Sequence, residues 1–319
     1  AASNINGSAE SDSNNFFIPE LGYNRMLNPD TSIGITVYAN GSMNTNYPNG
    51  QITSASGVGT CNNFLAMGGQ NTATSHNLLC GTSRLVVDLM QLVIAPTVAY
   101  KITPNHSFGI SPLIGYQRFK AEGLQGFAAY SEDRNNLTNN GYDTASGMGL
   151  RVGWMGKITD MVTLGAAYST KIYMTRFEKY KGLFAEGGDF DMPENYNAGI
   201  AVRPVKPLIV AFDYQRINYA GTQSVGNSSK NGGSAIANTL GGDNDRGFGW
   251  ENIDVWKLGL SYQANDLLTF RGGYSHSDNP IQSQDVTFNI LAPGVIKDHY
   301  TAGVSFKVSK SSELTLSYM

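Results

Sequence analysis

Residues 85–124 contain two long runs in which apolar and polar side chains alternate, joined by the turn Thr103-Pro104-Asn105-His106. Successive side chains of a strand point to opposite faces of a sheet, so this period of two predicts a β-hairpin. Each run exceeds the usual globular strand and is long enough for the roughly 9–11 residues with which a tilted strand crosses a bilayer. We expect a bulge or kink near Pro96 and Pro112, because proline cannot donate to a sheet ladder.

The same alternation continues along the chain and predicts twelve strands, connected by six short turns at one end and five longer loops at the other. They cover residues 16–27, 32–47, 85–102, 107–124, 148–158, 162–177, 194–204, 208–219, 253–264, 267–277, 299–309 and 313–319. Short periplasmic turns and long extracellular loops are typical of outer-membrane barrels. The sequence therefore predicts an all-β fold, a transmembrane antiparallel up-and-down β-barrel. Residues 1–319 would form this single domain, with residues 1–15 as a loop or frayed start.

The composition agrees with a barrel in lipid. Only 15% of the residues are charged, against about 25% in ordinary soluble domains. No apolar run approaches the roughly 18 residues of a membrane helix. The net charge of −3 gives no reason to expect nucleic-acid binding. A soluble all-β protein with equally long strands is the alternative, but lipid is the simpler explanation for an unbroken apolar outer face.

Several charged side chains fall on the face opposite the aliphatic residues. They include Arg151, Arg203, Asp213 and Arg271. A charged side chain facing lipid at the midplane costs about 2–4 kcal/mol, so we expect these residues to line a polar lumen. They would either brace the barrel through ion pairs or attract the carboxylate of a fatty acid, since guanidinium suits that group.

The first two long loops carry apolar side chains and the two cysteines. The apolar residues are Phe64, Leu65, Met67, Leu78 and Leu79 in the first loop and Leu124, Phe127 and Tyr130 in the second. Exposed apolar clusters often mark binding surfaces, so these residues would either capture an apolar ligand or pack together to hold the loops. Cys61 and Cys80 would form a disulfide in an oxidising compartment or remain free thiols.

The sequence shows no pattern of residues typical of an enzyme active site. Its histidines are His76, His106, His276 and His299, which are scattered and show no metal-ligand spacing. We therefore expect no catalytic residues, no metal and no cofactor. An outer-membrane hydrolase would need a converging nucleophile, base and orienting group, which no motif here indicates.

The order of motifs resembles the FadL/TodX family of outer-membrane transporters for hydrophobic compounds. The resemblance rests on YNRMLNPDTSIGITVYANGSMNTNYP, CGTSRLVVDLMQLVIAPTVAYKITPNHSFGISPLIGYQRFKAEGLQGF, YKGLFAEGGDFDMPENYNAGIAV, VAFDYQRINYAG and SDNPIQSQDVTFNILAPGVIKDHYTAGVSF. These segments are spread over nearly the whole chain.

The resemblance implies passive uptake of long-chain fatty acids or aromatic hydrocarbons without a cofactor. The ligand would be captured by the extracellular loops and released sideways into the membrane through a gap at a kinked strand. By position that strand is the second, where Asn40, Gly41 and Ser42 interrupt the apolar alternation and form the lateral-gate kink.

Two departures from the family pattern stand out. Family barrels have about fourteen strands and an N-terminal hatch that plugs the lumen. Here the hatch, the first strand and the last strand have no counterpart, and the chain stops at Met319 within what should be the penultimate strand. We therefore expect this chain to be an internal portion of a longer protein.

The expected location is the outer membrane of a Gram-negative bacterium. The expected partners are a hydrophobic small molecule, membrane lipid and lipopolysaccharide, with the protein as a monomer. Two other functions stay open: a diffusive porin for small polar solutes, and a barrel-anchored adhesin or receptor.

Overall fold

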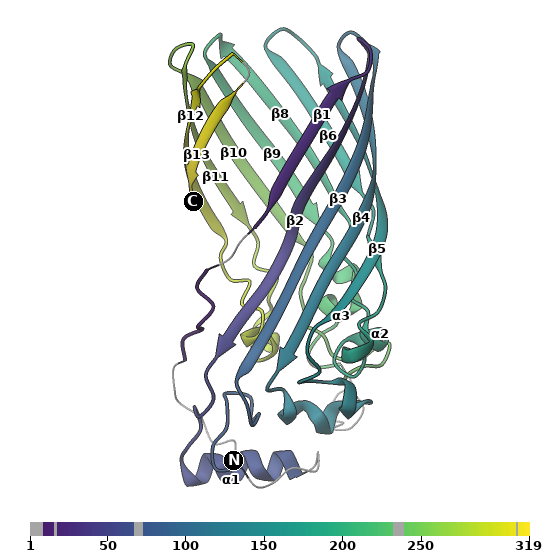
Figure 1. The fold of residues 1–319 in the computed structure, drawn as a ribbon, viewed down its shortest axis with the longest axis vertical. Coiled ribbons are helices and arrows are strands. Elements are labelled where there is room, and N and C mark those ends of the chain that lie inside the picture. The colour runs from purple at the N-terminus through teal and green to yellow at the C-terminus, as the bar shows by residue number, and fades with distance from the viewer. Residues whose placement is uncertain (1–8, 16–17, 67–72, 232–238, 311) are drawn as a thin grey trace.

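In the computed structural model, a single curled β-sheet forms a tall wall with all its short turns at one end and its long loops at the other (Figure 1). The structure describes residues 9–15, 18–66, 73–231, 239–310 and 312–319. Within these ranges, no helix is long and apolar enough to cross a membrane.

Twelve strands follow one another around the sheet in chain order, and every neighbouring pair is antiparallel. They are β1 (Glu20–Met26), β2 (Thr31–Tyr47), β3 (Leu85–Thr103), β4 (His106–Glu122), β5 (Asp143–Lys157), β6 (Val162–Ser169), β8 (Asn195–Val205), β9 (Leu208–Ile217), β10 (Ile253–Gln263), β11 (Leu268–Ser277), β12 (Asp298–Lys307) and β13 (Glu313–Tyr318). This confirms the predicted up-and-down architecture.

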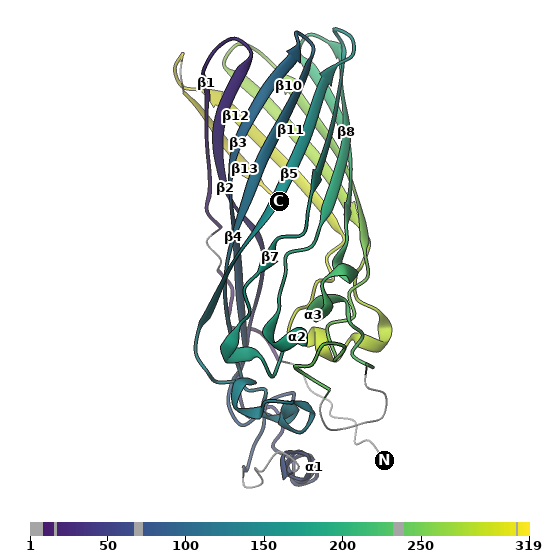
Figure 2. The same cartoon turned by 90° about the vertical axis from the view of Figure 1, so that its right-hand side faces the viewer.

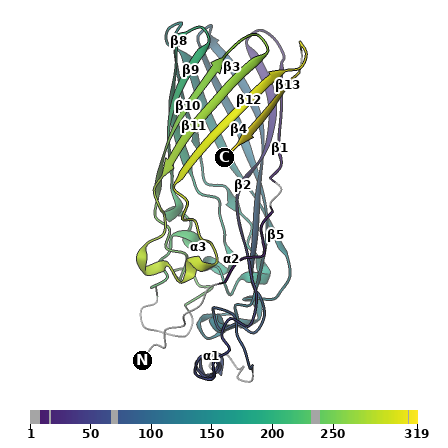
Figure 3. The same ribbon diagram turned by 90° about the vertical axis from the view of Figure 1, so that its left-hand side faces the viewer.

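The sheet curls round but does not close. Its edge strands are β1 and β13, and no pairing joins them among the described residues (Figure 3). The outward face is apolar over most of the wall; Val98 and Leu260, for example, are each 48% exposed. Such a face is stable in lipid and costly in water.

One predicted strand is wrong in its length. The sequence predicted a single strand over residues 162–177, but β6 ends at Ser169, and the chain then leaves the wall. The two residues of β7 (Tyr173–Met174) pair with β5 outside the main strand order (Figure 2). The alternation of apolar residues continues beyond Ser169 because the next residues pack in the interior.

Every helix in the described part of the chain lies at the loop end. They are α1 (Ala55–Ala66), α2 (Ala185–Gly188) and α3 (Gln223–Gly226), with short 3-10 turns at Gln125–Tyr130, Arg134–Asn136, Glu178–Tyr180, Tyr219–Gly221, Ser283–Asp285 and Phe288–Ile290. In Figure 1, α1 lies farthest from the barrel. The helices α2 and α3 lie close beneath the strand ends.

The inner face changes character along the barrel. Towards the turns it carries small and polar side chains, as predicted for a lumen. Towards the loops, β3 and β4 turn Leu85, Leu89, Leu113 and Phe119 inward, and all four are buried. The prediction of a polar interior is therefore wrong for the loop half, where the loops themselves fill the barrel and need an apolar surface to pack against.

Candidate functional site

The chain between β6 and β8, residues 170–194, fills the loop half of the barrel; we call it the inner segment. Its large apolar side chains belong to one buried cluster with β3 and β4. Around Phe119 of β4, the rings of Tyr180 and Phe184 lie 4.8 and 4.7 Å away between centroids, in edge-on contact. Such aromatic pairs add stability beyond the area that they bury. The lumen is thus closed at this end by the chain's own side chains.

Three inward glycines let the inner segment approach the wall. A β-carbon on Gly147 would lie 2.2 Å from the carbonyl oxygen of Tyr173, and one on Gly115 would lie 2.9 Å from the sulfur of Met174. Gly149 faces residues 170–172 in the same way. Larger residues at these positions would push the inner segment off the wall, so the glycines fix where the segment enters.

A small apolar cavity lies among the loops, and we call it the loop cavity. It measures about 30 Å³, and Leu124, Phe127, Phe184, Phe248 and Phe288 are among its lining residues. Leu124 and Phe127 were predicted to contact ligand, and the structure brings these two together here. An apolar solute gains about 25 cal/mol per Å² of surface on leaving water for such a site.

Beside the second strand lies a larger cavity of about 250 Å³, which we call the bulge pocket. The pairing of β2 with β3 shifts register between Ala39 and Gly41 and leaves Asn40 as an extra residue. This β-bulge falls where the sequence predicted an interruption, and Asn40, Gly41 and Ser42 all line the pocket. Bulges redirect side chains and bend a strand, and here the bend coincides with a cavity.

The bulge pocket has an aromatic wall and an amide wall. Phe190, Tyr219, Phe248 and Trp250 supply the rings, and Tyr219 meets Trp250 edge-on with centroids 5.0 Å apart. The amides are Asn40, Gln91, Asn195 and Gln215. A site of this composition fits a compact, mostly apolar ligand.

The bulge pocket lies between two other cavities. It shares Phe248 with the loop cavity. It shares Ser42, Met43 and Trp250 with a further cavity of about 290 Å³, the edge cavity, which lies at the edge of β2 not covered by β1. Together the three cavities form a series from the loops to the barrel wall.

The other predicted loop residues that the structure describes do not line these cavities. Leu65 is buried in α1, Leu78 and Leu79 are partly buried against the core, and Tyr130 lies beneath the guanidinium of Arg246. The side chain of Phe64 and the whole of Met67 lie outside the described residues.

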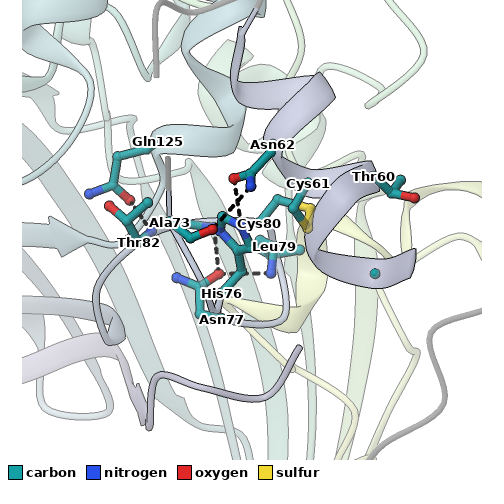
Figure 4. Close-up of a disulfide and its surroundings, with 12 residues drawn as sticks. Thr60, Cys61, Asn62, Ala73, His76, Asn77, Leu79, Cys80, Thr82 and Gln125 are labelled. Carbon is teal, nitrogen blue, oxygen red and sulfur yellow. Dashed lines mark hydrogen bonds between the residues drawn. A yellow bond between two sulfur atoms is a disulfide. The ribbon is translucent and has the colours of Figure 1, made fainter. Parts of the chain in front are cut away.

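Cys61 and Cys80 are joined by a disulfide, with their Cα atoms 5.1 Å apart. The bond ties α1 to the turn around Asn77, whose side-chain oxygen accepts from the backbone N–H groups of Leu79 and Gly81 (Figure 4). Nearby, Asn62 and His76 share a side-chain hydrogen bond of 3.0 Å.

The predicted lumen residues lie towards the turn half. Arg151 and Asp213 line a cavity of about 580 Å³, and Arg151 donates to the hydroxyls of Tyr38 and Ser169. Arg271 hydrogen-bonds to Ser305 and lies 3.5 Å from Glu313. Arg203 sits near the end of β8, exposed beside the turn. The bonds to Ser169 and Ser305 join neighbouring strands, whereas Tyr38 and Glu313 belong to strands that do not pair with those of the arginines.

Sequence reasoning missed Gln91 and Gln117, which are buried inside the barrel. The side chain of Asn40 donates to Gln91 at 3.3 Å, Gln91 donates to Gln117 at 2.9 Å, and Gln117 donates to the backbone carbonyl of Phe190 at 2.9 Å. The chain of amides thus connects the bulge to the inner segment. The sequence could have indicated this contact, because Gln91 and Gln117 fall opposite each other when the 85–124 hairpin is paired about its turn.

The carboxyl group of Asp189, in the inner segment, has a raised pKa. Burial, followed by the charges of Asp191 and Glu186, raises the pKa of Asp189 to about 7, although Lys171 acts in the opposite direction. Asp189 directly precedes Phe190, so its charge changes next to the bulge pocket.

These features define a class of protein, a membrane β-barrel whose lumen is filled by its own loops. Residues 61–319 match the model of the family described as outer membrane protein transport protein (OMPP1/FadL/TodX), and the chain belongs to that family. The predicted resemblance is confirmed.

Solved structures agree on the fold. The Pseudomonas putida toluene transporter TodX is 19% identical, with a TM-score of 0.62 over 94% of this chain and 76% of its own. The Ralstonia pickettii toluene transporter TbuX is 18% identical, with a TM-score of 0.57 over 91% and 72%. A Pseudomonas aeruginosa FadL homologue is 14% identical, with a TM-score of 0.61 over 94% and 68%. No curated protein sequence matches the chain significantly.

Proposed function

We propose that this protein is a channel for the passive uptake of small hydrophobic molecules across the outer membrane of a Gram-negative bacterium. The ligand enters among the loops, occupies the bulge pocket and leaves sideways into the membrane at β2. The observation that carries this proposal is the series of three cavities, which share Phe248 on one side of the bulge pocket and Ser42, Met43 and Trp250 on the other.

Lateral release suits an apolar cargo. A molecule that crossed the lumen would return to water and lose the free energy gained on binding, about 25 cal/mol per Å² of apolar surface. At the edge cavity the lower part of β2 pairs with β3 on one side. On the other side Thr45 donates to the carbonyl of Leu291 at 3.3 Å, and the backbone of Asn46 bonds to Ser11 and Asp12. This part of the wall is therefore held by fewer hydrogen bonds than a continuous ladder.

A buried inner segment argues against a diffusive porin. Small polar solutes need a continuous aqueous path, and Phe177, Tyr180 and Phe184 occupy the loop half of the barrel. The protein in a planar bilayer should accordingly show little ion conductance, and a large steady conductance would favour the porin instead.

Deletion of Asn40 tests the lateral route. Asn40 is the extra residue of the bulge, so its removal joins the two registers of β2 without turning any other side chain to the opposite face. Cells that take up p-xylene through the wild-type protein should lose that uptake in the deletion variant, while the barrel still assembles. As a control, Asn105 can be deleted from the opposite turn. Undiminished uptake by the Asn40 deletion would contradict release at the bulge.

A further inference from the structure

The orientation of every amide in the chain from the bulge to the inner segment is fixed by its last member. The carbonyl of Phe190 can only accept, so Gln117 must donate to it with Nε2 and must turn Oε1 towards Gln91. Gln91 then donates with Nε2 and turns its own Oε1 towards Asn40, whose Nδ2 donates. Each of the three amide nitrogens therefore donates one hydrogen bond within the chain.

The free end of this chain is an acceptor. Asn40 Oδ1 receives no hydrogen bond from any residue that the structure describes, and the Asn40 side chain is exposed at the pocket. Gln91 and Gln117 are 6% and 0% exposed, so water has little access to compete with their bonds.

The opposite side of the pocket presents a donor by the same reasoning. Lys257 can only donate, and its ammonium lies 2.9 Å from Oε1 of Gln215. Nε2 of Gln215 is thereby left without a partner in the described part of the chain. The bulge pocket thus offers a ligand an amide acceptor at Asn40 and an amide donor at Gln215, beside the rings of Phe190, Tyr219, Phe248 and Trp250.

The charged side chain that lines the pocket already has partners. Asp191, the one charged residue that lines it in the described ranges, accepts from the backbone N–H of Met174 and lies 3.5 Å from Lys171. Lys171 also donates to the carbonyl of Gly221, and Lys257 to Gln215. A carboxylate ligand would be desolvated beside Asp191 with no cation of its own, which is costly.

We propose that the bulge pocket selects neutral aromatic compounds that carry one hydroxyl group, over hydrocarbons of the same shape and over carboxylates. A hydroxyl both donates and accepts, so it can donate to Asn40 Oδ1 or accept from Gln215 Nε2, whereas a methyl group does neither and a carboxylate cannot donate. This inference rests on the proposed uptake function and names the substrate class of the same site.

Gln117 is a positioning residue for this selection. It does not line the pocket, but it holds the amide of Gln91 in one orientation and ties Phe190 to the wall. If Gln117 could not donate, Gln91 and Asn40 would be free to rotate and would present donors and acceptors without preference.

Three para-substituted toluenes provide the test: p-cresol and p-xylene, which have the same shape, and the larger carboxylate p-toluate. The protein in lipid vesicles is dialysed to equilibrium against each compound, and protein-free vesicles of the same lipid give the blank. One well-placed hydrogen bond corresponds to roughly threefold to tenfold in affinity, so we expect p-cresol to bind about that much more tightly than p-xylene, and p-toluate most weakly. Equal affinity for p-cresol and p-xylene, or tighter binding of p-toluate, would overturn the proposal.

Variants then assign the effect to the amide chain. Gln117→Leu and Asn40→Leu should each bring the ratio of p-cresol to p-xylene affinity close to one. Gln117 is buried, so its variant could fold poorly. Asn40 is exposed, so its variant tests the same bonds without that risk. The matched control is Thr97→Val with Ser111→Ala, which removes a side-chain bond between the same two strands that does not reach the inner segment. A ratio that survives Asn40→Leu, or that the control abolishes equally, would refute the assignment.

The failure of this inference is distinguishable from failure of the proposed function. If the protein carries p-xylene and p-cresol into cells but binds them equally, the proposed uptake function is supported and the proposed selection by the hydroxyl group is refuted. If neither compound enters faster than in cells without the protein, both fall together.

Discussion

The hydroxyl oxygens of Thr97 and Ser111 lie 2.7 Å apart and join β3 to β4 where the backbone ladder is interrupted. Pro96 and Pro112 stand opposite one another at this point, and proline has no N–H to donate. The register is nevertheless the same on both sides of the gap, at Ile94 and at Val98. The predicted bulge near the prolines is therefore absent from this strand pair, and a side-chain bond spans the gap instead.

Loss of this bond should destabilise the barrel, and the loss in free energy of unfolding should depend on whether one hydroxyl is left behind or both are removed. Thr97→Val leaves Ser111 buried without that partner, which should cost about 1–3 kcal/mol. Replacing both residues, with Val and Ala, should cost less than the sum of the single changes. Urea unfolding of the protein in vesicles, followed by its gel mobility without heating, measures these differences. Strict additivity would mean that the two hydroxyls do not interact.

The extent of sequence prediction differs between the wall and the site. The alternation of apolar and polar residues predicted the twelve strands, because the outward side chains face the same apolar lipid, which favours apolar residues. The bulge at Asn40 was also predictable, since Asn40, Gly41 and Ser42 break that alternation. Inward residues obey no such rule: Phe119 and Phe190 lie 71 positions apart, yet both contact Phe184.

The end of β6 shows the same limit. Residues 170–177 continue a plausible strand pattern, and only the glycines of β4 and β5 reveal that the chain turns inward there. Gly115, Gly147 and Gly149 are needed because the inner segment lies against them. The apolar pattern within a single strand does not show that contact. The role of the predicted loop residues was similarly hard to assign from the sequence, because apolar loop residues pack together as readily as they line a cavity.

The raised pKa of Asp189 predicts a pH dependence. The folded protein binds this proton more tightly than the unfolded chain, so the free energy of unfolding should fall as the pH rises from near 3.8 to about 7, and then level off. Asp189→Asn should remove that part of the slope and slow hydrogen exchange in the inner segment at pH 8. Hydrogen exchange at pH 5 and pH 8, corrected for intrinsic rates, measures both.

A control for this pH effect is Asp160→Asn. Asp160 lies in an exposed turn, where the hydrogen bond from Lys157 lowers the pKa of its carboxyl. Its charge is therefore constant above pH 5, and the variant should keep the wild-type difference in exchange. An Asp189→Asn protein with the wild-type pH dependence would show that another group is responsible.

The Cys61–Cys80 disulfide should stabilise the first long loop and leave the barrel unaffected. With a separation of 19 residues, the chain-entropy estimate is about 3 kcal/mol. Replacing both cysteines with serine should speed hydrogen exchange in α1 and leave exchange in β8 and β9 unchanged. Reduction of the wild-type protein should give the same result, and slowed uptake would reveal that this loop takes part in ligand entry.

A side chain at Gly147 should open the loop end of the barrel. In Gly147→Ala the new β-carbon would lie 2.2 Å from the carbonyl of Tyr173, so the inner segment must move away from β5. Because that segment fills the lumen, ion conductance in a planar bilayer should rise, and the aromatic cluster around Phe119 should exchange faster. Gly153→Ala is the matched control on the same strand, since its nearest contact would be 3.6 Å, to Ala166. Equal conductance in the two variants would mean that the inner segment does not seal the channel.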